Sequence, residues 1–304
     1  MAKFKFYVGN AFADPKRTDL SGNPAAVVIL ENDSDIDDKI KQSIGTQFNL
    51  SETVFVSKQP NEDEFLIRWF TPEKEAELCG HATLVTSHIL LTEQHCYTKF
   101  IQEIKLDNGD QQLKFKSKWG TKIQVTLDSN NDNIIMSFPS YVPVSVESEK
   151  WCDKLVQALI GANKRDWIND IRLADNGYIL LQLKDGYNIK EIMPNYNLCK
   201  TLELDKPVCL AIITQRANYD VEGVHFYARV FAPWYGVLED PVCGSAFTLT
   251  SPYWNEKLQD SNSEWFIAKQ MSKRGGIVYT RVEDDRTLIG GQVQLFCEGH
   301  FTLQ

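Results

Sequence analysis

Two cysteines, Cys79 and Cys243, each open the same short pattern, Cys-Gly-x-Ala. Apolar residues at helical spacing follow both, so the pattern predicts a cysteine at the start of a helix. A helix N-terminus presents unpaired N–H groups and a partial positive charge, which suit a carboxylate or phosphate. The same charge favours the thiolate form of a cysteine. The two patterns therefore indicate acid–base or nucleophilic chemistry on a small anionic substrate.

The pattern belongs to a longer internal repeat. The two copies read FLIRWFTPEKEAELCGHATL (65–84) and FYARVFAPWYGVLEDPVCGSAFTL (226–249). Eleven positions lead from Arg68 to Cys79 and fourteen from Arg229 to Cys243, so the second loop is three residues longer. Each copy is typical of a strand, a proline-containing loop and a helix that begins at Cys-Gly. The repeat predicts two similar halves whose helix starts face one cleft between them.

The elements around the repeat are mostly short strands, rich in β-branched and aromatic residues and bounded by turn residues. Helices are expected at about 35–48, 82–94, 149–160 and 245–258, with Pro252 expected to kink or end the last one. The polar segment 128–133 favours a boundary between an N-terminal half, 1–130, and a C-terminal half, 131–304, with the last strands packing across it. These elements indicate two α+β domains, each with many strands and one long central helix.

Composition limits the classes of function. The chain has 304 residues, of which 43% are hydrophobic and 24% charged, and its net charge of −9 disfavours nucleic acid and anionic membranes as partners. It has no apolar run of membrane-span or signal-peptide type, so a cytoplasmic protein is expected. Its seven cysteines are scattered without a C-x-x-C pair, which argues against a disulfide framework or zinc ribbon. With no common cofactor motif, neither cofactor nor metal is expected.

Several motifs together resemble one family. In chain order they are SGNPAAVVIL (21–30), NLSETVFV (49–56), FTPEKEAELCGHAT (70–83), EDPVCGSA (239–246) and KRGG (273–276). They resemble the phenazine-biosynthesis (PhzF-like) isomerases, which have the diaminopimelate epimerase fold, over essentially the whole chain. The resemblance implies two pseudo-symmetric halves, each a curved, largely antiparallel sheet around a central helix. It also implies cofactor-independent proton transfer at carbon, and a homodimer as the assembly.

The resemblance assigns site residues by motif. Glu52 would be the general acid/base, with His81 binding or polarising the substrate and Asp240 and Ser245 completing the site. The same neighbourhood includes the residues expected to bind substrate: Asn23, Cys79, Gly80, Cys243 and Gly244. Each polar residue also has a purely structural interpretation, such as a helix cap or a turn. For Glu52 we expect a pKa raised by an enclosed site that includes Val54 and Val56.

Three alternatives stay open. In the epimerase branch of this fold, cysteines at both helix starts are the paired acid and base, so Cys79 and Cys243 could act as a two-thiol racemase. That branch has Gly-Asn after its first cysteine, whereas this chain has Gly80-His81. A Cys243 or Ser245 nucleophile with His81 as base would make a hydrolase or acyl transferase. A protein that binds small carboxylates without turnover is the third.

Overall fold

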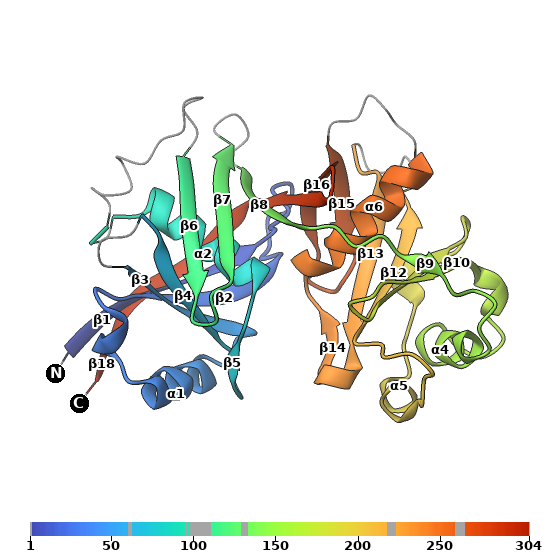
Figure 1. Cartoon of the computed structure of the whole chain (residues 1–304), viewed down its shortest axis with the longest axis horizontal. Coiled ribbons are helices and arrows are strands. Elements are labelled where there is room, and N and C mark those ends of the chain that lie inside the picture. Colours follow the sequence, from blue (N-terminus) through green and yellow to red (C-terminus); the bar gives the residue numbers. More distant parts are fainter. Residues whose placement is uncertain are drawn as a thin grey trace. The chain divides into compact units, whose positions relative to one another are not determined.

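The computed structural model describes residues 2–59, 63–94, 96–97, 111–128, 133–217, 223–258 and 265–303. The chain forms two compact units, Met1–Ser137 with Gly290–Gln304 (unit 1) and Phe138–Ile289 (unit 2). Strands β8 (Asn133–Pro139) and β17 (Arg286–Gly291) each contain residues of both units. Figure 1 shows the elements coloured along the sequence. The polar segment 128–133 that the sequence favours as a boundary lies partly outside the described residues.

Unit 1 is built on a sheet of mixed but mostly antiparallel strands. They are β1 (Ala2–Ala11), β2 (Asn23–Ile29), β3 (Glu52–Lys58), β4 (Phe65–Phe70), β5 (Glu75–Ala76), β6 (Gln111–Ser117), β7 (Lys122–Asp128), β8 and β18 (Val293–Leu303). Pairing runs in the order β18, β1, β2, β3, β4, β6, β7, β8, with β5 also on β4. Only β2–β3 and β4–β6 are parallel within this series. The last strand of the chain therefore completes the first unit.

Unit 2 repeats this arrangement strand for strand. Its strands are β9 (Val144–Ser145), β10 (Ile168–Leu173), β11 (Tyr178–Leu183), β12 (Leu210–Arg216), β13 (Phe226–Ala232), β14 (Val237–Asp240), β15 (Phe266–Gln270), β16 (Gly276–Glu283) and β17. Pairing runs β9, β10, β11, β12, β13, β15, β16, with β14 on β13, and the parallel pairs are β11–β12 and β13–β15. The internal repeat in the sequence is thus a repeat of topology, and the expected α+β fold is confirmed.

One buried helix lies at the centre of unit 1. Helix α2 (Gly80–Thr92) packs against β1, β2, β3 and β18, and nearly every residue of its first two turns is buried. A helix that is apolar on all sides is stable only when other elements of the protein bury it on all sides. Its buried hydroxyls bond to the preceding turn, as when Thr83 Oγ1 donates to the Cys79 carbonyl at 2.6 Å. The helix begins at Cys-Gly, so the expected position of the thiol at a helix start is confirmed.

The equivalent helix of unit 2, α6 (Phe247–Leu258), follows the 3₁₀ turn η5 (Gly244–Ala246). Pro252 lies inside α6, so of the two outcomes expected for it, a kink or an end of the helix, the end is wrong. Proline cannot donate to the carbonyl four residues earlier, that of Thr248. The Tyr141 N–H donates to this carbonyl at 2.9 Å instead. An outside donor therefore satisfies the group that the proline leaves free.

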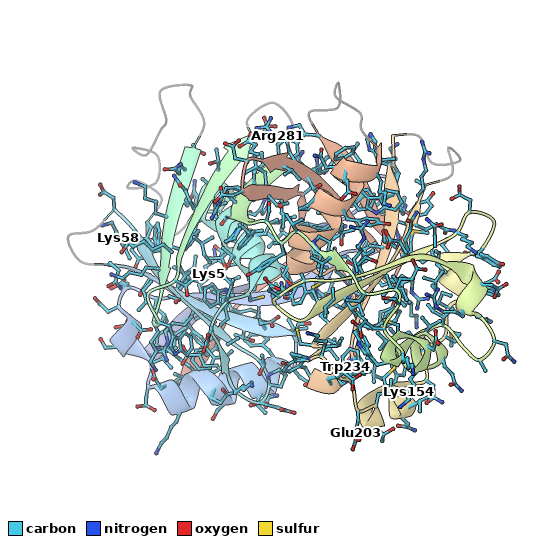
Figure 2. All side chains as sticks on the ribbon, turned by 45° about the vertical axis from the view of Figure 1, so that its right-hand side comes forward. Lys5, Lys58, Lys154, Glu203, Trp234 and Arg281 are labelled. Atoms are coloured by element: carbon cyan, nitrogen blue, oxygen red, sulfur yellow. The ribbon has the colours of Figure 1, made fainter. Side chains whose placement is uncertain are left out.

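The remaining helices cover the sheets. They are η1 (Asp33–Asp35), α1 (Asp38–Phe48), α4 (Trp151–Leu159), η2 (Arg165–Trp167), η3 (Ile189–Glu191), α5 (Tyr196–Thr201) and η4 (Pro233–Tyr235). In unit 2 the apolar face of α4 packs in a core with β10, β11 and β12, while charged side chains such as Lys154 and Glu203 lie outside (Figure 2). Helix α5 was not expected from the sequence. Within the described ranges no helix is both long enough and apolar enough to span a membrane.

The repeated arginine forms the same ion pair in both units. Arg68 on β4 binds Glu75 on β5 through two hydrogen bonds of 2.7 and 2.8 Å. Arg229 on β13 binds Glu239 on β14 in the same way, at 2.7 and 3.0 Å. The Nη1 group of Arg68 also donates to Asp38 at the start of α1, at 2.5 Å. We call these pairs the arginine clamps; each fixes the hairpin that leads to a Cys-Gly helix start.

Candidate active site

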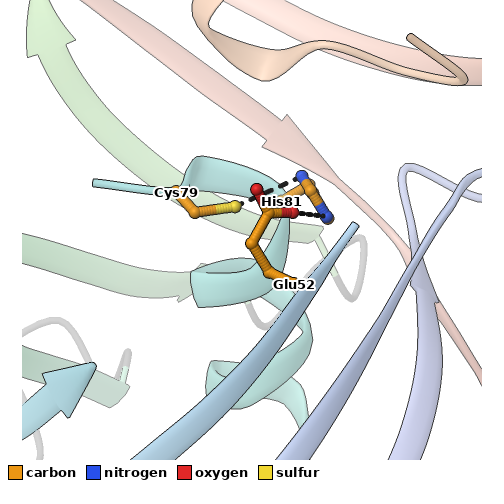
Figure 3. A group of neighbouring side chains, drawn as sticks. All are labelled: Glu52, Cys79 and His81. Carbon is orange, nitrogen blue, oxygen red and sulfur yellow. Dashed lines mark hydrogen bonds and ion pairs between the residues drawn. The ribbon is translucent and has the colours of Figure 1, made fainter. Parts of the chain in front are cut away.

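A thiol, an imidazole and a carboxylate lie close together in unit 1, with donor atoms of all three within 4.8 Å of one another. Cys79 is the N-cap residue of α2, His81 is in its first turn, and Glu52 is the first residue of β3. The Cys79 Sγ lies 3.3 Å from Nδ1 of His81, and the opposite ring nitrogen, Nε2, lies 3.1 Å from Oε2 of Glu52. Figure 3 shows the three side chains grouped together, with dashed lines from the two ring nitrogens of His81 to Cys79 and Glu52. We call these three residues the acid–base cluster.

The charges of this cluster are set by burial and by mutual attraction. Burial alone would raise the pKa of Glu52, but the charge of His81 and the close approach of His81 and Cys79 outweigh it, and the pKa is lowered. Burial would lower the pKa of His81, but Cys79 and Glu52 outweigh it, and the pKa is raised well above its ordinary value. The expectation of a raised Glu52 pKa is therefore wrong in sign. The pair favours a carboxylate beside an imidazolium.

Glu52 and His81 do not satisfy each other fully. Their 3.1 Å approach lacks the geometry of a hydrogen bond, and neither Oε2 of Glu52 nor Nε2 of His81 has another hydrogen-bond partner among the described residues. Both atoms are buried, and a buried polar atom without a hydrogen bond is costly. Such atoms are well suited to bind a ligand that supplies the missing contacts.

The two thiols differ from the sequence expectation. Burial, followed by the charge of Glu52, raises the pKa of Cys79 to about 11. Burial, followed by the charge of Asp240, raises the pKa of Cys243 well above its ordinary value. The helix start does not overcome these effects, so neither thiol is favoured as a thiolate at neutral pH. The expected thiolate character is contradicted at both positions.

A second cluster surrounds Cys243 in unit 2. Its Sγ lies 3.4 Å from Oγ of Ser245, and the Tyr178 hydroxyl donates to the same Oγ at 3.1 Å. The buried amide of Gln270 accepts from the Cys243 N–H at 3.0 Å and donates to the Asp240 carbonyl at 2.7 Å. Four of these residues, Asp240, Cys243, Ser245 and Tyr178, form what we call the hydroxyl cluster.

The two clusters occupy equivalent places but carry different chemistry. Cys79 matches Cys243, and His81 matches Ser245, in the repeated Cys-Gly-x-Ala pattern. The strand registers extend the match, because Ala25 pairs with Glu52 in unit 1 and Tyr178 pairs with Leu210 in unit 2. Leucine therefore stands where unit 1 has its carboxylate. The carboxylate–imidazole pair is a feature of unit 1 alone in this repeat.

The other expected substrate-binding residues lie beside these clusters. Asn23, the buried first residue of β2, accepts from the Ser51 hydroxyl at 3.5 Å, next to Glu52 in the chain. Gly80 is the first residue of α2, and Gly244 is the first residue of η5. Sequence reasoning missed Tyr178, because no motif surrounds it. Its one signal is its place in the repeat. Tyr178 stands where unit 1 has Ala25, two residues after Asn23 of the SGNP motif.

The acid–base cluster also has the composition of a metal site. One donor atom each from Glu52, Cys79 and His81 lies within 4.8 Å of the others. Thiolate, imidazole and carboxylate are common zinc ligands. A metal ion would have to displace the proton of the Cys79 thiol, whose pKa of about 11 opposes this. Glu52 joins Cys79 and His81 only in the fold, so no metal motif is visible in the sequence.

Comparison with known proteins adds a further line of evidence. Residues 10–299 match the PhzC-PhzF family, described as phenazine biosynthesis-like protein. An uncharacterized isomerase of Halalkalibacterium halodurans is 33% identical over 290 residues, covering 94% of each chain. A crystal structure of a PhzF-family phenazine biosynthesis protein from Enterococcus faecalis has a TM-score of 0.79 at 31% identity, covering 99% of this chain and 100% of that one. A hydroxyproline epimerase from Agrobacterium vitis shares the fold, with a TM-score of 0.55 at 12% identity, covering 98% and 92%.

Proposed function

Because the chain belongs to the phenazine biosynthesis-like family, we propose that it is an isomerase that moves a proton at carbon of a small carboxylate, with Glu52 as the general acid/base. The observation that carries this proposal is the buried Glu52–His81 pair, whose facing atoms lack aligned hydrogen bonds. Its lowered pKa keeps Glu52 in the carboxylate form that a general base requires at neutral pH.

The proton would move in two steps. The Glu52 carboxylate takes a proton from a carbon made acidic by a neighbouring carboxyl or unsaturated group, and the electron pair of the broken C–H bond moves toward that group. The His81 imidazolium stabilises the charge that develops there. Protonated Glu52 then returns the proton to the same carbon or to another carbon of the conjugated system. No electron is lost or gained, and Glu52 ends as it began.

The hydroxyl cluster would hold the substrate rather than move protons. Ser245 is exposed, and its Oγ accepts from Tyr178 while remaining able to donate to a substrate oxygen. The N–H groups at Gly80 and Gly244 would add donors for a carboxylate. The proposal gives Asp240 the role of a further polar contact with the substrate.

The two-thiol alternative predicts a different dependence on side chains. It is favoured by the matching positions of Cys79 and Cys243, and disfavoured by thiol pKa values raised at both. In addition, Cys79 faces His81 on its own helix. These observations favour the one-carboxylate mechanism over the pair of thiols.

The test is deuterium uptake from heavy water across a panel of small carboxylic and amino acids. Glu52→Gln keeps the shape of the side chain and removes the basic oxygen, so uptake is expected to fall by about 10²- to 10⁴-fold with ligand binding retained. Glu77→Gln, an exposed change in the loop before Cys79, is the matched control and keeps full uptake. A dead Cys79→Ala/Cys243→Ala variant beside an active Glu52→Gln would establish the two-thiol mechanism. Binding without uptake in the wild type would indicate a catalytically silent protein.

A further inference from the structure

We propose that Cys79 is a positioning residue, whose thiol holds Nδ1 of His81 so that Nε2 faces Glu52. The consequence for turnover rests on the proposed function, whereas the effect on the imidazole itself does not. The role differs from both interpretations of this thiol in the sequence, because Cys79 neither transfers the substrate proton nor merely fills space.

The geometry of the imidazole supports this role. The Cys79 Sγ lies 3.3 Å from Nδ1 and the Glu52 Oε2 lies 3.1 Å from Nε2, and donor atoms of the three side chains lie within 4.8 Å of one another. Only 8% of His81 and 7% of Cys79 are exposed, so water gives little compensation for a lost contact. The thiol thus occupies Nδ1, which leaves Nε2 to face the carboxylate.

The sulfur is itself held in place. The Cys79 carbonyl accepts from the Thr83 hydroxyl at 2.6 Å and from the Thr83 N–H at 3.2 Å. The same hydroxyl accepts from Nε1 of the buried Trp69 at 3.2 Å. This chain of bonds fixes the backbone at Cys79 to β4, the strand of the first arginine clamp.

A thiol suits this position better than the usual N-cap groups do. Serine, threonine and aspartate at an N-cap turn their side chains to the helix N–H groups. The Cys79 side chain makes no such capping bond, and so it is left to contact His81. A thiol is both a weak donor and a weak acceptor, so it can serve Nδ1 whether or not that nitrogen carries a proton. The contact is therefore available to His81 both as the imidazolium and as the neutral imidazole.

The second repeat provides the contrast. Cys243 occupies the same place, but the residue two positions on is Ser245, and Leu210 stands at the position of the carboxylate. Its thiol contacts a hydroxyl at 3.4 Å. The same cysteine therefore has an imidazole to orient only in unit 1, where the acid–base pair lies.

The test reads the imidazole directly by NMR of protein labelled with ¹⁵N at histidine, with His81→Asn used to assign the signals. In Cys79→Ala, we expect the His81 titration midpoint to fall by about half a unit to one unit, the size of one lost hydrogen bond, and its ring nitrogen shifts to change. Cys79→Ser is expected to lie between alanine and wild type, and it provides the answer if the alanine variant does not fold. Cys209→Ala, a partly exposed thiol of unit 2, controls for loss of a thiol elsewhere.

Unchanged His81 signals in folded Cys79→Ala or Cys79→Ser would overturn the proposal and leave Cys79 as a packing residue. Where a substrate is found, Cys79→Ala is expected to lower kcat by about 2- to 10-fold with KM little changed. If Glu52→Gln retains full proton exchange while the His81 midpoint moves as expected, the proposed function fails and the positioning role stands.

Discussion

Removing the first arginine clamp should destabilise the protein strongly. Arg68→Met keeps the apolar stem of the side chain but leaves three carboxylates that the guanidinium contacts, those of Asp33, Asp38 and Glu75. Breaking a buried ion pair by removing one partner costs roughly 3–5 kcal/mol. Lys41 Nζ still lies 2.6 Å from Asp33 and partly compensates the charge of that carboxylate. The expected loss in unfolding free energy is therefore near the lower limit, about 3 kcal/mol. The melting temperature should fall by on the order of 10 °C.

The assay is urea unfolding at low and high salt, with Arg229→Met as the matched variant. Arg229 faces one carboxylate, that of Glu239, and otherwise the carbonyls of Ile189 and Ile192. Repulsion among exposed carboxylates is screened by salt, so added salt should reduce the loss in Arg68→Met and barely affect Arg229→Met. A loss below about 1 kcal/mol in Arg68→Met, or the same salt response in both variants, would refute this account of the clamp.

Two further predictions concern titration. The lowered pKa of Glu52 contributes stability that is present above its ordinary value of 4.5 and lost as pH falls through the folded pKa. The raised pKa of His81 contributes stability that is present below 6.5 and lost as pH rises through its folded pKa. The difference in unfolding free energy between wild type and Glu52→Gln/His81→Asn should therefore be largest between pH 4.5 and pH 6.5. A difference that does not vary with pH would contradict the pairing of Glu52 with His81. In iodoacetamide labelling at neutral pH followed by mass spectrometry, Cys79 and Cys243 should react much more slowly than the exposed Cys96; fast labelling of both would revive the two-thiol mechanism.

The repeat made most of the fold predictable. Matching arginine, proline and Cys-Gly positions imply matching strands and helix starts, and the two units have the same pairing order. Two local features were not predictable. Helix α5 is one short element whose stability depends on packing, and the continuation of α6 through Pro252 depends on a donor at Tyr141, far away in the sequence.

The site was predictable where its residues share a motif. Cys79 and His81 are two positions apart, and Glu52 was found through the family motif, not through its chemistry. Tyr178 comes from a different strand without a distinctive neighbour, so only the fold brings it to Ser245. The Glu52 pKa was mispredicted because the sequence suggests only burial, which raises it. The charge of His81 lowers it, and only the structure shows how close that charge lies.

The pairing of β1 with β18 affects how the chain can fold during synthesis. Residues of β1 leave the ribosome before those of unit 2, but the partner strand emerges only after the whole of unit 2 has been made. Until then one edge of β1 is open, and open strand edges are sites of aggregation. Unit 2 is continuous in the chain and has all of its own strands before β18 appears. The half of the protein that carries the carboxylate–imidazole pair is therefore begun before unit 2 and completed after it.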